Sequence, residues 1–344
     1  MTISNTDALT RTIEHREIFH DEMLSLVRRI MGGEMSPVMM AALLVGLRVK
    51  KETIGEITAA AQVMREFSTK VEVADRTYLV DIVGTGGDGS HTFNISTCSM
   101  FVAAACGARV SKHGNRSVSS KSGSADVLEA LGMPLSLPPP AIARCIADTG
   151  IGFMFAPNHH PAMKNVAAVR KELGVRTIFN ILGPLTNPAD ASCQLMGVFA
   201  PDLTDLMAHV LNELGSKSVF VVCGYGGLDE LTTTGPNHIS VLRDGEVKTY
   251  DLDATSLGFR GANISELLGG DPETNAGILR DVLSGKTQDA KRDTVLLNSA
   301  AALVAAQKAG DLEEGIELAK QSIDSGAALG KLDELVAFGK RVAA

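Results

Sequence analysis

Tryptophan is absent from this chain of 344 residues, and tyrosine occurs only three times. Such a sequence offers little aromatic surface on which nucleic-acid bases could stack. An excess of basic residues is lacking too, because 32 Lys and Arg stand against 40 Asp and Glu, which gives a formal net charge of −8. Proteins that bind duplex nucleic acid usually carry a basic surface. We therefore predict that nucleic acid is not a partner.

Long hydrophobic runs and recognisable cysteine patterns are also missing. The longest apolar runs, such as residues 39–45, are far too short to span a bilayer, and the N-terminus has no basic patch followed by an apolar stretch. The five cysteines are odd in number and share no metal-like spacing, which suits reduced thiols. These absences predict a cytoplasmic protein with no signal peptide and no membrane partner.

Glycine, by contrast, is abundant and concentrated after one predicted strand. An apolar run at residues 80–83 leads into GTGGDG at residues 84–89, which places four glycines and an aspartate within six residues. Because glycine has no Cβ, the backbone N–H groups of such a loop can converge on one anionic oxygen. The loop is therefore a candidate phosphate site, with a tight turn that binds nothing as the alternative.

A second stretch of basic, hydroxyl and glycine residues follows at residues 112–126 (KHGNRSVSSKSGSAD). It comes after a predicted strand at residues 108–111. Between the two stretches, NIST at residues 94–97 opens a predicted helix at residues 98–106. Ligands of open α/β sheets bind beyond the carboxyl ends of strands, and helix N-termini favour anions. Two such loops at one sheet edge predict a ligand with phosphates at two places.

The first seventy residues predict helices only. Apolar residues recur at helical spacing in residues 21–31 and 54–67, and Ser36-Pro37 opens a further helix between them. The apolar stripe of that helix has two interpretations, since it could pack in the core or form a dimer face. We predict a small helical domain at residues 1–73.

From Tyr78 onward short strands alternate with helices, which is typical of a mostly parallel α/β sheet. We predict an α/β domain at residues 74–344, with the chain returning to the helical domain near residues 165–190 through a punctuated linker at residues 180–188. Further elements are predicted as strands at residues 152–156 and 218–222 and as helices at residues 125–131 (capped by Ser122 or Ser124), 141–148 and 293–306.

Two short polar motifs have both an ordinary and a functional interpretation. Paired histidines at His159-His160 suggest metal binding, but no Cys or carboxylate at ligand spacing accompanies them, so we favour a loop role. Asp229-Glu230 lies on a glycine-rich stretch after a predicted strand. Adjacent carboxylates suit Mg²⁺, whereas two solvated acids in a turn are the alternative.

Five motifs in one order along the chain resemble the anthranilate phosphoribosyltransferase family. They are GTGGD at residues 84–88, NIST at residues 94–97, the stretch from Lys112 to Gly132, NILGPLTNP at residues 180–188, and Asp229-Glu230. The resemblance covers nearly the whole chain. It implies a small N-terminal helical domain joined to a larger α/β domain with a mostly parallel central sheet, similar to nucleoside phosphorylases and phosphoribosyltransferases.

The reaction implied by this resemblance is the transfer of the phosphoribosyl group of 5-phosphoribosyl 1-pyrophosphate (PRPP) to the amine of anthranilate. The products are N-(5-phosphoribosyl)anthranilate and pyrophosphate, and the step belongs to tryptophan biosynthesis. The resemblance also implies Mg²⁺ as cofactor, a homodimer formed through the helical domain, and a cytoplasmic location.

The resemblance assigns roles to individual positions of this sequence. PRPP would contact Gly84, Gly87, Asp88, Thr92, Asn94, Ile95, Ser96, Thr97, Lys112, His113, Gly114, Asn115, Arg116, Ser117, Val118, Ser119, Ser120 and Ser124. Anthranilate would contact Gly84, His113, Asn115, His160, Met163, Arg170 and Pro184. Magnesium would be held by Ser96, Asp229 and Glu230. Cys223 stands where many members of the family carry a histidine, and we assign it no role.

Displacement of pyrophosphate from the anomeric carbon builds positive charge on the ribose and negative charge on the leaving group, so we expect mainly electrostatic catalysis. Mg²⁺ and Lys112 would take up the leaving charge near Asp88, and Arg170 would bind the acceptor carboxylate. Anthranilate's amine is a nucleophile without prior deprotonation, and we assign no residue as general acid or base.

Two other functions stay open from the sequence. A pyrimidine nucleoside phosphorylase resembles this family in fold and also acts at a ribose anomeric carbon, but it would leave Arg170 and the Asp229-Glu230 pair without a purpose. A member of the family turned to binding, including binding of nucleic acid, would need a basic groove, against which the acidic composition argues.

Overall fold

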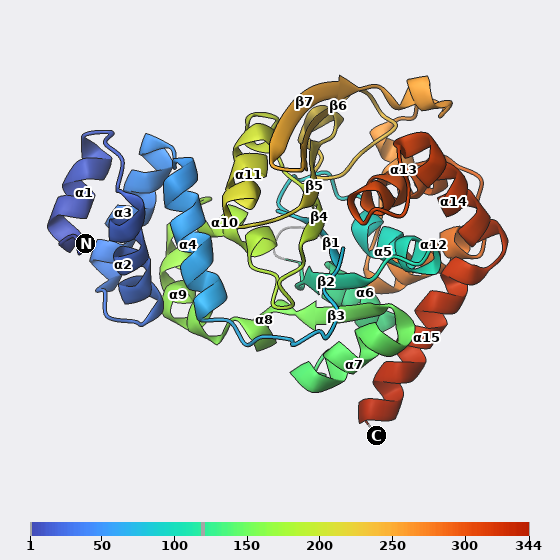
Figure 1. The fold of residues 1–344 in the computed structure, drawn as a ribbon, viewed down its shortest axis with the longest axis horizontal. Coiled ribbons are helices and arrows are strands. Elements are labelled where there is room, and N and C mark those ends of the chain that lie inside the picture. The colour runs from blue at the N-terminus through green and yellow to red at the C-terminus, as the bar shows by residue number, and fades with distance from the viewer. Residues whose placement is uncertain (1, 118–120, 344) are drawn as a thin grey trace.

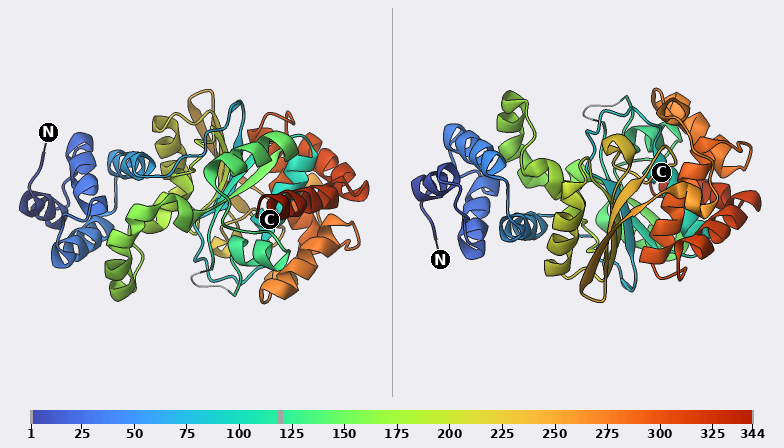
Figure 2. Two further views of the ribbon diagram at one scale, coloured as in Figure 1. Left: turned by 90° about the horizontal axis from the view of Figure 1, so that it is seen from below. Right: turned by 90° about the horizontal axis from the view of Figure 1, so that it is seen from above.

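The computed structural model describes residues 2–117 and 121–343, and places a small helical unit at one end of an elongated molecule (Figure 1). Two further views show the same division (Figure 2). Ser36 caps a helix that starts with Pro37, as predicted, by accepting a hydrogen bond from the Met39 N–H. The first helices are α1 (Asn5–Ile13), α2 (His20–Met31), α3 (Pro37–Lys50) and α4 (Ile54–Glu66).

A seven-stranded sheet forms the centre of the larger unit. Its strands are β1 (Val80–Gly84), β2 (Val110–Gly114), β3 (Ile151–Phe155), β4 (Cys193–Gly197), β5 (Ser218–Cys223), β6 (Asn237–Arg243) and β7 (Glu246–Leu252). They lie in the order β3-β2-β1-β4-β5-β6-β7, with β1 to β5 parallel and β6 and β7 antiparallel. The prediction of a mostly parallel sheet is confirmed, and the antiparallel hairpin at its edge is a feature that the sequence analysis did not include.

Helices cover both faces of this sheet (Figure 2). They are α5 (Ile95–Ala105), α6 (Ser124–Ala130), α7 (Pro139–Thr149), α11 (Asp202–Glu213), α12 (Pro272–Leu283), α13 (Ala290–Ala305), α14 (Leu312–Asp324) and α15 (Ala327–Ala343). In the described part of the chain no helix combines the length and the apolar character needed to cross a membrane.

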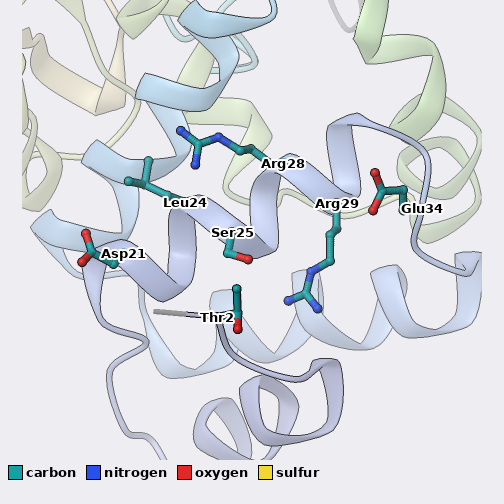
Figure 3. Close-up of a pocket in the computed structure, with 7 residues that line it drawn as sticks. All are labelled: Thr2, Asp21, Leu24, Ser25, Arg28, Arg29 and Glu34. Carbon is teal, nitrogen blue, oxygen red and sulfur yellow. The ribbon is translucent and has the colours of Figure 1, made fainter.

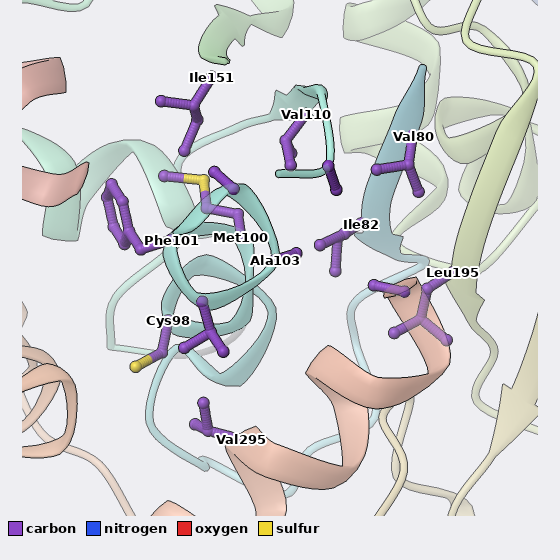
Figure 4. Close-up of a cluster of buried hydrophobic side chains, with 14 of the residues drawn as sticks. Val80, Ile82, Cys98, Met100, Phe101, Ala103, Val110, Ile151, Leu195 and Val295 are labelled. Atoms are coloured by element: carbon purple, nitrogen blue, oxygen red, sulfur yellow. The ribbon is translucent and has the colours of Figure 1, made fainter. Parts of the chain in front are cut away.

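The two faces of the sheet belong to two hydrophobic cores because side chains alternate along a strand. Leu195 of β4 packs in the core that contains Phe101 of α5 and Val295 of α13 (Figure 4). The next residue, Met196, packs in the other core, which includes Leu44 of α3. The helical unit therefore shares its core with one face of the sheet, and the sheet is buried on both sides, as parallel sheets usually are.

The chain contacts the helical unit again between β3 and β4. This crossover contains α8 (Ala156–His159), α9 (Lys164–Leu173), α10 (Phe179–Leu182) and a 3₁₀ turn at Gly183–Leu185. The Asn165 amide donates to the Met31 carbonyl (2.7 Å), and the Arg65 guanidinium donates to the Leu185 carbonyl (2.7 Å). Because residues 67–79 contain no helix or strand, we propose residues 73 and 74 as the boundary between the two domains.

Three local predictions are wrong. The strand expected at residues 108–111 starts at Val110 instead, because the Ala108 N–H still bonds to the Ala103 carbonyl at the end of α5. Neither Ser122 nor Ser124 caps α6. Gly123 occupies that position, and its N–H donates to the carboxylate of Asp126 (2.9 Å). The expected linker at residues 180–188 folds into α10 and the 3₁₀ turn, with several buried apolar side chains.

Candidate functional site

Five parallel strands end at the same edge of the sheet, and residues predicted to contact PRPP lie there. Gly84, the last residue of β1, pairs with Gly197, the last residue of β4. Strand β2 lies on the other side of β1. Chain order therefore reverses between β1 and β4, and in open α/β sheets such a switch point is where ligands bind.

The glycine loop after β1 has the backbone conformation that its composition predicts. Gly86, Gly87 and Gly89 all have positive φ angles of 69° to 75°, which residues with a Cβ rarely adopt. The Gly86 N–H donates to Oδ2 of Asp229 (2.6 Å). Asp88 folds back on the loop and accepts from the backbone and hydroxyl of Ser90 (3.2 and 2.7 Å). The loop is thus tied to the acidic pair.

The acidic pair lies beside the N-terminus of α5. Oε1 of Glu230 accepts from the Ser96 N–H (3.2 Å), and the Asp229 N–H lies 3.5 Å from Oδ2 of Asp88. Desolvation and then the charge of Asp88 raise the pKa of Asp229 to about 7. Desolvation and then the charge of Asp229 raise the pKa of Glu230 to about 8. These half-buried and hydrogen-bonded carboxyl groups differ from the solvated acids of the alternative interpretation.

Like charges held this close favour a cation between them. No three His, Cys, Asp or Glu side chains among the described residues are arranged so that they could hold one ion. Mg²⁺ does not need such a set, because it usually keeps several waters and is held by one or two carboxylates together with substrate phosphates. The donor set of Asp229, Glu230 and the Ser96 hydroxyl fits this kind of site.

Glycines on three strand ends make room for the acidic pair. A Cβ at Gly84 would lie 2.3 Å from Oδ2 of Asp229, and a Cβ at Gly197 would lie 1.6 Å from the Asp229 carbonyl oxygen. A Cβ at Gly224 would lie 2.3 Å from the Glu230 carbonyl oxygen. Sequence analysis missed Gly197 and Gly224, because their role is a close approach by backbone that is distant in the sequence.

Lys112 reaches this cluster from inside the protein. Only 2% of the residue is exposed, and its ammonium donates to the Ile82 carbonyl and to the Ser96 hydroxyl (3.1 Å). Burial lowers its pKa, while the carboxylates of Asp81, Glu230 and Asp229 act against that shift. The Lys112 ammonium and the Glu230 carboxylate therefore both contact Ser96, while the adjacent Asp229 carboxylate accepts from Gly86 of the glycine loop.

A buried carboxyl–amide pair supports the end of β2, and the sequence analysis missed it. Oδ1 of Asp81 accepts from the His113 N–H (3.1 Å), and its Oδ2 accepts from the Asn187 amide (2.7 Å). The same amide also donates to the Ser111 carbonyl (2.8 Å). Burial raises the pKa of Asp81 to about 6. This pair fixes the backbone that presents Lys112 and His113.

The other residues predicted to contact PRPP lie around this cluster. The Asn94 amide donates to the Ser122 carbonyl (3.0 Å), and Ile95 and Thr97 are buried at the start of α5. Thr92 lines a cavity of about 210 Å³ together with His91, Lys121, Ser122, Leu268, Gly269 and Gly270. A larger cavity of about 680 Å³ lies in the helical unit, around Arg28 and Arg29, and holds none of the predicted site residues (Figure 3).

The second polar stretch, which begins at Lys112, makes hydrogen bonds and ion pairs with α6. The Asn115 carbonyl accepts from the Ser124 hydroxyl (3.3 Å). The Arg116 guanidinium pairs with Asp126 and Glu129 (2.8 Å each), so its charge is already matched in this structure. The Ser117 N–H also donates to Asp126 (3.0 Å). A Cβ at Gly114 would lie 2.2 Å from the Ser124 hydroxyl. Val118, Ser119 and Ser120 lie outside the described residues.

Arg170, which the resemblance assigns to the acceptor carboxylate, lies on α9 of the crossover. Its guanidinium lies 5.7 Å from the centre of the Phe179 ring, and desolvation lowers its pKa. No carboxylate in the described part of the chain lies within ion-pair distance of it. Met163 is partly buried in the turn before α9, and Pro184 is buried in the 3₁₀ turn after α10. Among the described residues no hydrogen bond or ion pair joins Arg170 to the glycine loop.

Three histidines form a buried group beside β2. The rings of His113 and His160 lie 5.0 Å apart, and Nδ1 of His159 contacts the Thr69 carbonyl (2.9 Å). Burial lowers the pKa of each, and neighbouring histidines add to the shift at His113 and His160. The group is neutral at pH 7, consistent with a lining role rather than with a phosphate-binding one.

Acidification is expected to destabilise the protein through this group. The unfolded His160 imidazole binds a proton with a pKa of about 6.5, whereas burial lowers the folded value to about 4. The unfolded state therefore takes up more protons below pH 6.5, and the contribution of this residue to stability falls by about 2 kcal/mol from pH 7 to pH 5. Denaturant unfolding of wild type and His160→Gln should show that difference, and His209→Gln, at a half-exposed position of α11, is the control. Parallel pH dependences for wild type and His160→Gln would contradict it.

Comparisons with known proteins match both units. The model described as glycosyl transferase family, a/b domain, matches residues 76–329, and the model of the helical bundle domain of a glycosyl transferase family matches residues 6–68. An anthranilate phosphoribosyltransferase from a Polaromonas strain is 61% identical over 342 residues, which covers 99% of this chain and 98% of that protein. The enzyme of that name from Burkholderia mallei is 59% identical and covers 98% of each chain.

Solved structures agree with these matches. The crystal structure of anthranilate phosphoribosyltransferase from Thermus thermophilus superposes with a TM-score of 0.92 at 44% identity, covering 97% of this chain and 99% of that one. The enzyme from Saccharomyces cerevisiae in complex with PRPP and Mg has a TM-score of 0.84 at 30% identity, covering 98% of this chain and 94% of that one.

Proposed function

Because this chain belongs to the family of anthranilate phosphoribosyltransferases, we propose that the cluster at the sheet edge performs the family's reaction with Mg²⁺ as cofactor. The reaction transfers the phosphoribosyl group of PRPP to the amine of anthranilate and releases pyrophosphate, in tryptophan biosynthesis. The observation that carries the proposal is that Lys112 and Glu230 both contact Ser96, while the adjacent Asp229 accepts from the Gly86 N–H of the glycine loop.

On the side of the site that would bind PRPP, the positive electrostatic potential has two sources. Backbone N–H groups of the glycine loop and the N-terminus of α5 attract phosphate oxygens. The Lys112 ammonium adds a buried charge, which acts strongly because water is excluded around it. Asp229, Glu230 and Ser96 would hold Mg²⁺, which when bound neutralises the developing charge of the pyrophosphate. The backbone N–H groups, the Lys112 ammonium and a bound Mg²⁺ would thus each stabilise the leaving group.

The acceptor side needs a carboxylate-binding group and an apolar wall. Arg170 has no carboxylate partner in the described part of the chain, and its planar guanidinium suits two parallel hydrogen bonds to the acceptor carboxylate. The neutral rings of His113 and His160, with Met163 and Pro184, would line the aromatic part of the acceptor. Anthranilate's amine attacks without prior deprotonation, so orientation and charge neutralisation supply most of the rate.

We propose a homodimer formed through the helical unit. Val38 and Val49 of α3 are 82% and 65% exposed, and Ile13 of α1, which packs beside α3, is 69% exposed. Covering these apolar side chains with a second copy would remove them from water. Light scattering that gives the mass of one chain, 36.2 kDa, would exclude the dimer. We also propose a cytoplasmic location, which the five free cysteines support.

The test of the proposed function is product formation by the purified protein. With PRPP, anthranilate and Mg²⁺ we expect loss of anthranilate fluorescence and a product with the mass of N-(5-phosphoribosyl)anthranilate, and we expect excess EDTA to stop the reaction. Cleavage of a pyrimidine nucleoside by phosphate, with no use of PRPP, would contradict the proposal and support a nucleoside phosphorylase. Turnover that is unchanged in EDTA would contradict the metal part alone.

A further inference from the structure

Arg176 connects the acceptor side of the site to the glycine loop. It lies two residues beyond Gly174, which ends α9 with a left-handed backbone conformation (φ 61°). Its guanidinium carbon lies 3.9 Å from the centre of the Phe199 ring, and its Nη2 donates a hydrogen bond to the Gly87 carbonyl. One side chain therefore joins three segments, namely the exit of α9, the turn after β4 and the loop after β1.

The Phe199 ring limits the orientations that the guanidinium can adopt. An arginine that lies on an aromatic face is attracted to the ring, and its planar group then presents N–H donors in fixed directions. Phe199 is itself partly buried against the core of the helical unit. Arg176 is an exposed residue, but contact with the Phe199 ring holds its guanidinium in place. In the described part of the chain no carboxylate lies within ion-pair distance of it.

The bond to Gly87 sets the direction of a backbone N–H group. In a trans peptide the C=O and the following N–H point in opposite directions. Holding the Gly87 oxygen on Arg176 therefore directs the Asp88 N–H away from Arg176. Across the described residues, no acceptor takes the N–H groups of Gly87, Asp88 or Gly89. These N–H groups are the hydrogen-bond donors that a phosphate bound to the loop would contact.

The loop has two anchors of different origin. At Gly86 the N–H is held by Asp229, from the loop after β5. At Gly87 the carbonyl is held by Arg176, from the crossover that also contains Arg170. Glycine peptides rotate more freely than others, so without the second anchor the loop would sample several orientations of its N–H groups. Binding of PRPP would then have to order the loop, and its affinity would be lower.

We propose that Arg176 is a positioning residue that pre-orders the glycine loop for the pyrophosphate group of the donor. The inference rests on the proposed function, since it takes PRPP as the ligand of this loop. Arg176 does not contact the substrate in this arrangement. It acts through the Gly87 carbonyl, and the Phe199 ring holds it there.

Calorimetric titration with PRPP and with inorganic pyrophosphate, both in saturating Mg²⁺, tests the proposal. For Arg176→Ala we expect the Kd of both ligands to rise about 10-fold, while the KM for anthranilate stays unchanged. Phe199→Leu keeps the arginine but removes the ring, and a smaller rise is expected. The matched control is Arg144→Ala, because Arg144 also lies over a ring, that of Phe338 (5.4 Å), but on α7.

The substitution Arg176→Lys separates position from charge. A lysine keeps the charge but not the planar stacking, so it should restore less than half of the lost binding energy. Full recovery with lysine would overturn the proposal in favour of a charge effect, and an unchanged Kd in Arg176→Ala would overturn it outright. If the wild-type protein neither binds PRPP nor turns it over, the proposed function fails and the inference fails with it. Turnover by the wild type with no effect of Arg176→Ala makes the inference fail alone.

Discussion

Replacing Asp229 with asparagine and Glu230 with glutamine in one variant is expected to lower kcat/KM for PRPP about 1000-fold or more. Both substitutions keep the shape of the side chain and an oxygen that can accept from Gly86 or Ser96. They remove the negative charge that would hold Mg²⁺. Initial rates measured over a range of Mg²⁺ concentrations, with Glu213→Gln on α11 as the control, give the comparison.

Stability separates this loss of activity from unfolding. The raised pKa values of Asp229 and Glu230 mean that ionising them costs folding free energy when no cation is present. Neutral amides avoid this cost, so the variant should melt in EDTA at the same temperature as wild type or higher. A variant that keeps its activity and its Mg²⁺ dependence would contradict the assignment of the metal site. A variant that melts well below wild type would show that the pair has a structural role.

Replacing Arg170 with alanine is expected to raise the KM for anthranilate about 100-fold, and to change the KM for PRPP much less. The guanidinium is partly desolvated in the fold and has no carboxylate partner among the described residues, so binding energy is available for the acceptor carboxylate. The loss corresponds to about 3 kcal/mol, which is usual when one member of a buried charged pair is removed.

Two further variants sharpen this test. Arg170→Lys should fall between wild type and alanine, because lysine keeps the charge but cannot form two parallel hydrogen bonds. Lys171→Ala, at the next and exposed position of α9, is the matched control and should behave as wild type. Equal increases in both KM values for Arg170→Ala would contradict a specific acceptor role.

The parts of the fold and site that were predictable are those with a local signal. The glycine loop, the helix start at Asn94 and the acidic pair each combine a short motif with a preceding strand or a following helix, and the structure places them together because parallel strands end at one edge. The sheet class follows from alternation of elements for the same reason.

The parts that could not be predicted depend on contacts between distant segments. Gly197 is required because the backbone of Asp229 passes against it, and nothing in the residues around Gly197 indicates this. In the sequence Arg176 cannot be distinguished from any other basic residue after a helix. Only the fold shows its contacts with Phe199 and Gly87. The hairpin of β6 and β7 was not predicted either, because β7 is an edge strand and is largely exposed, so it lacks a buried apolar face.

The most direct test of a metal-assisted donor site is anomalous diffraction from crystals grown with PRPP and Mn²⁺ in place of Mg²⁺. The account predicts an anomalous peak within coordination distance of Asp229 and Glu230, with the pyrophosphate beside the glycine loop at residues 86–89. A pyrophosphate bound there with no peak near the two carboxylates, or a peak at another place in the molecule, would contradict it.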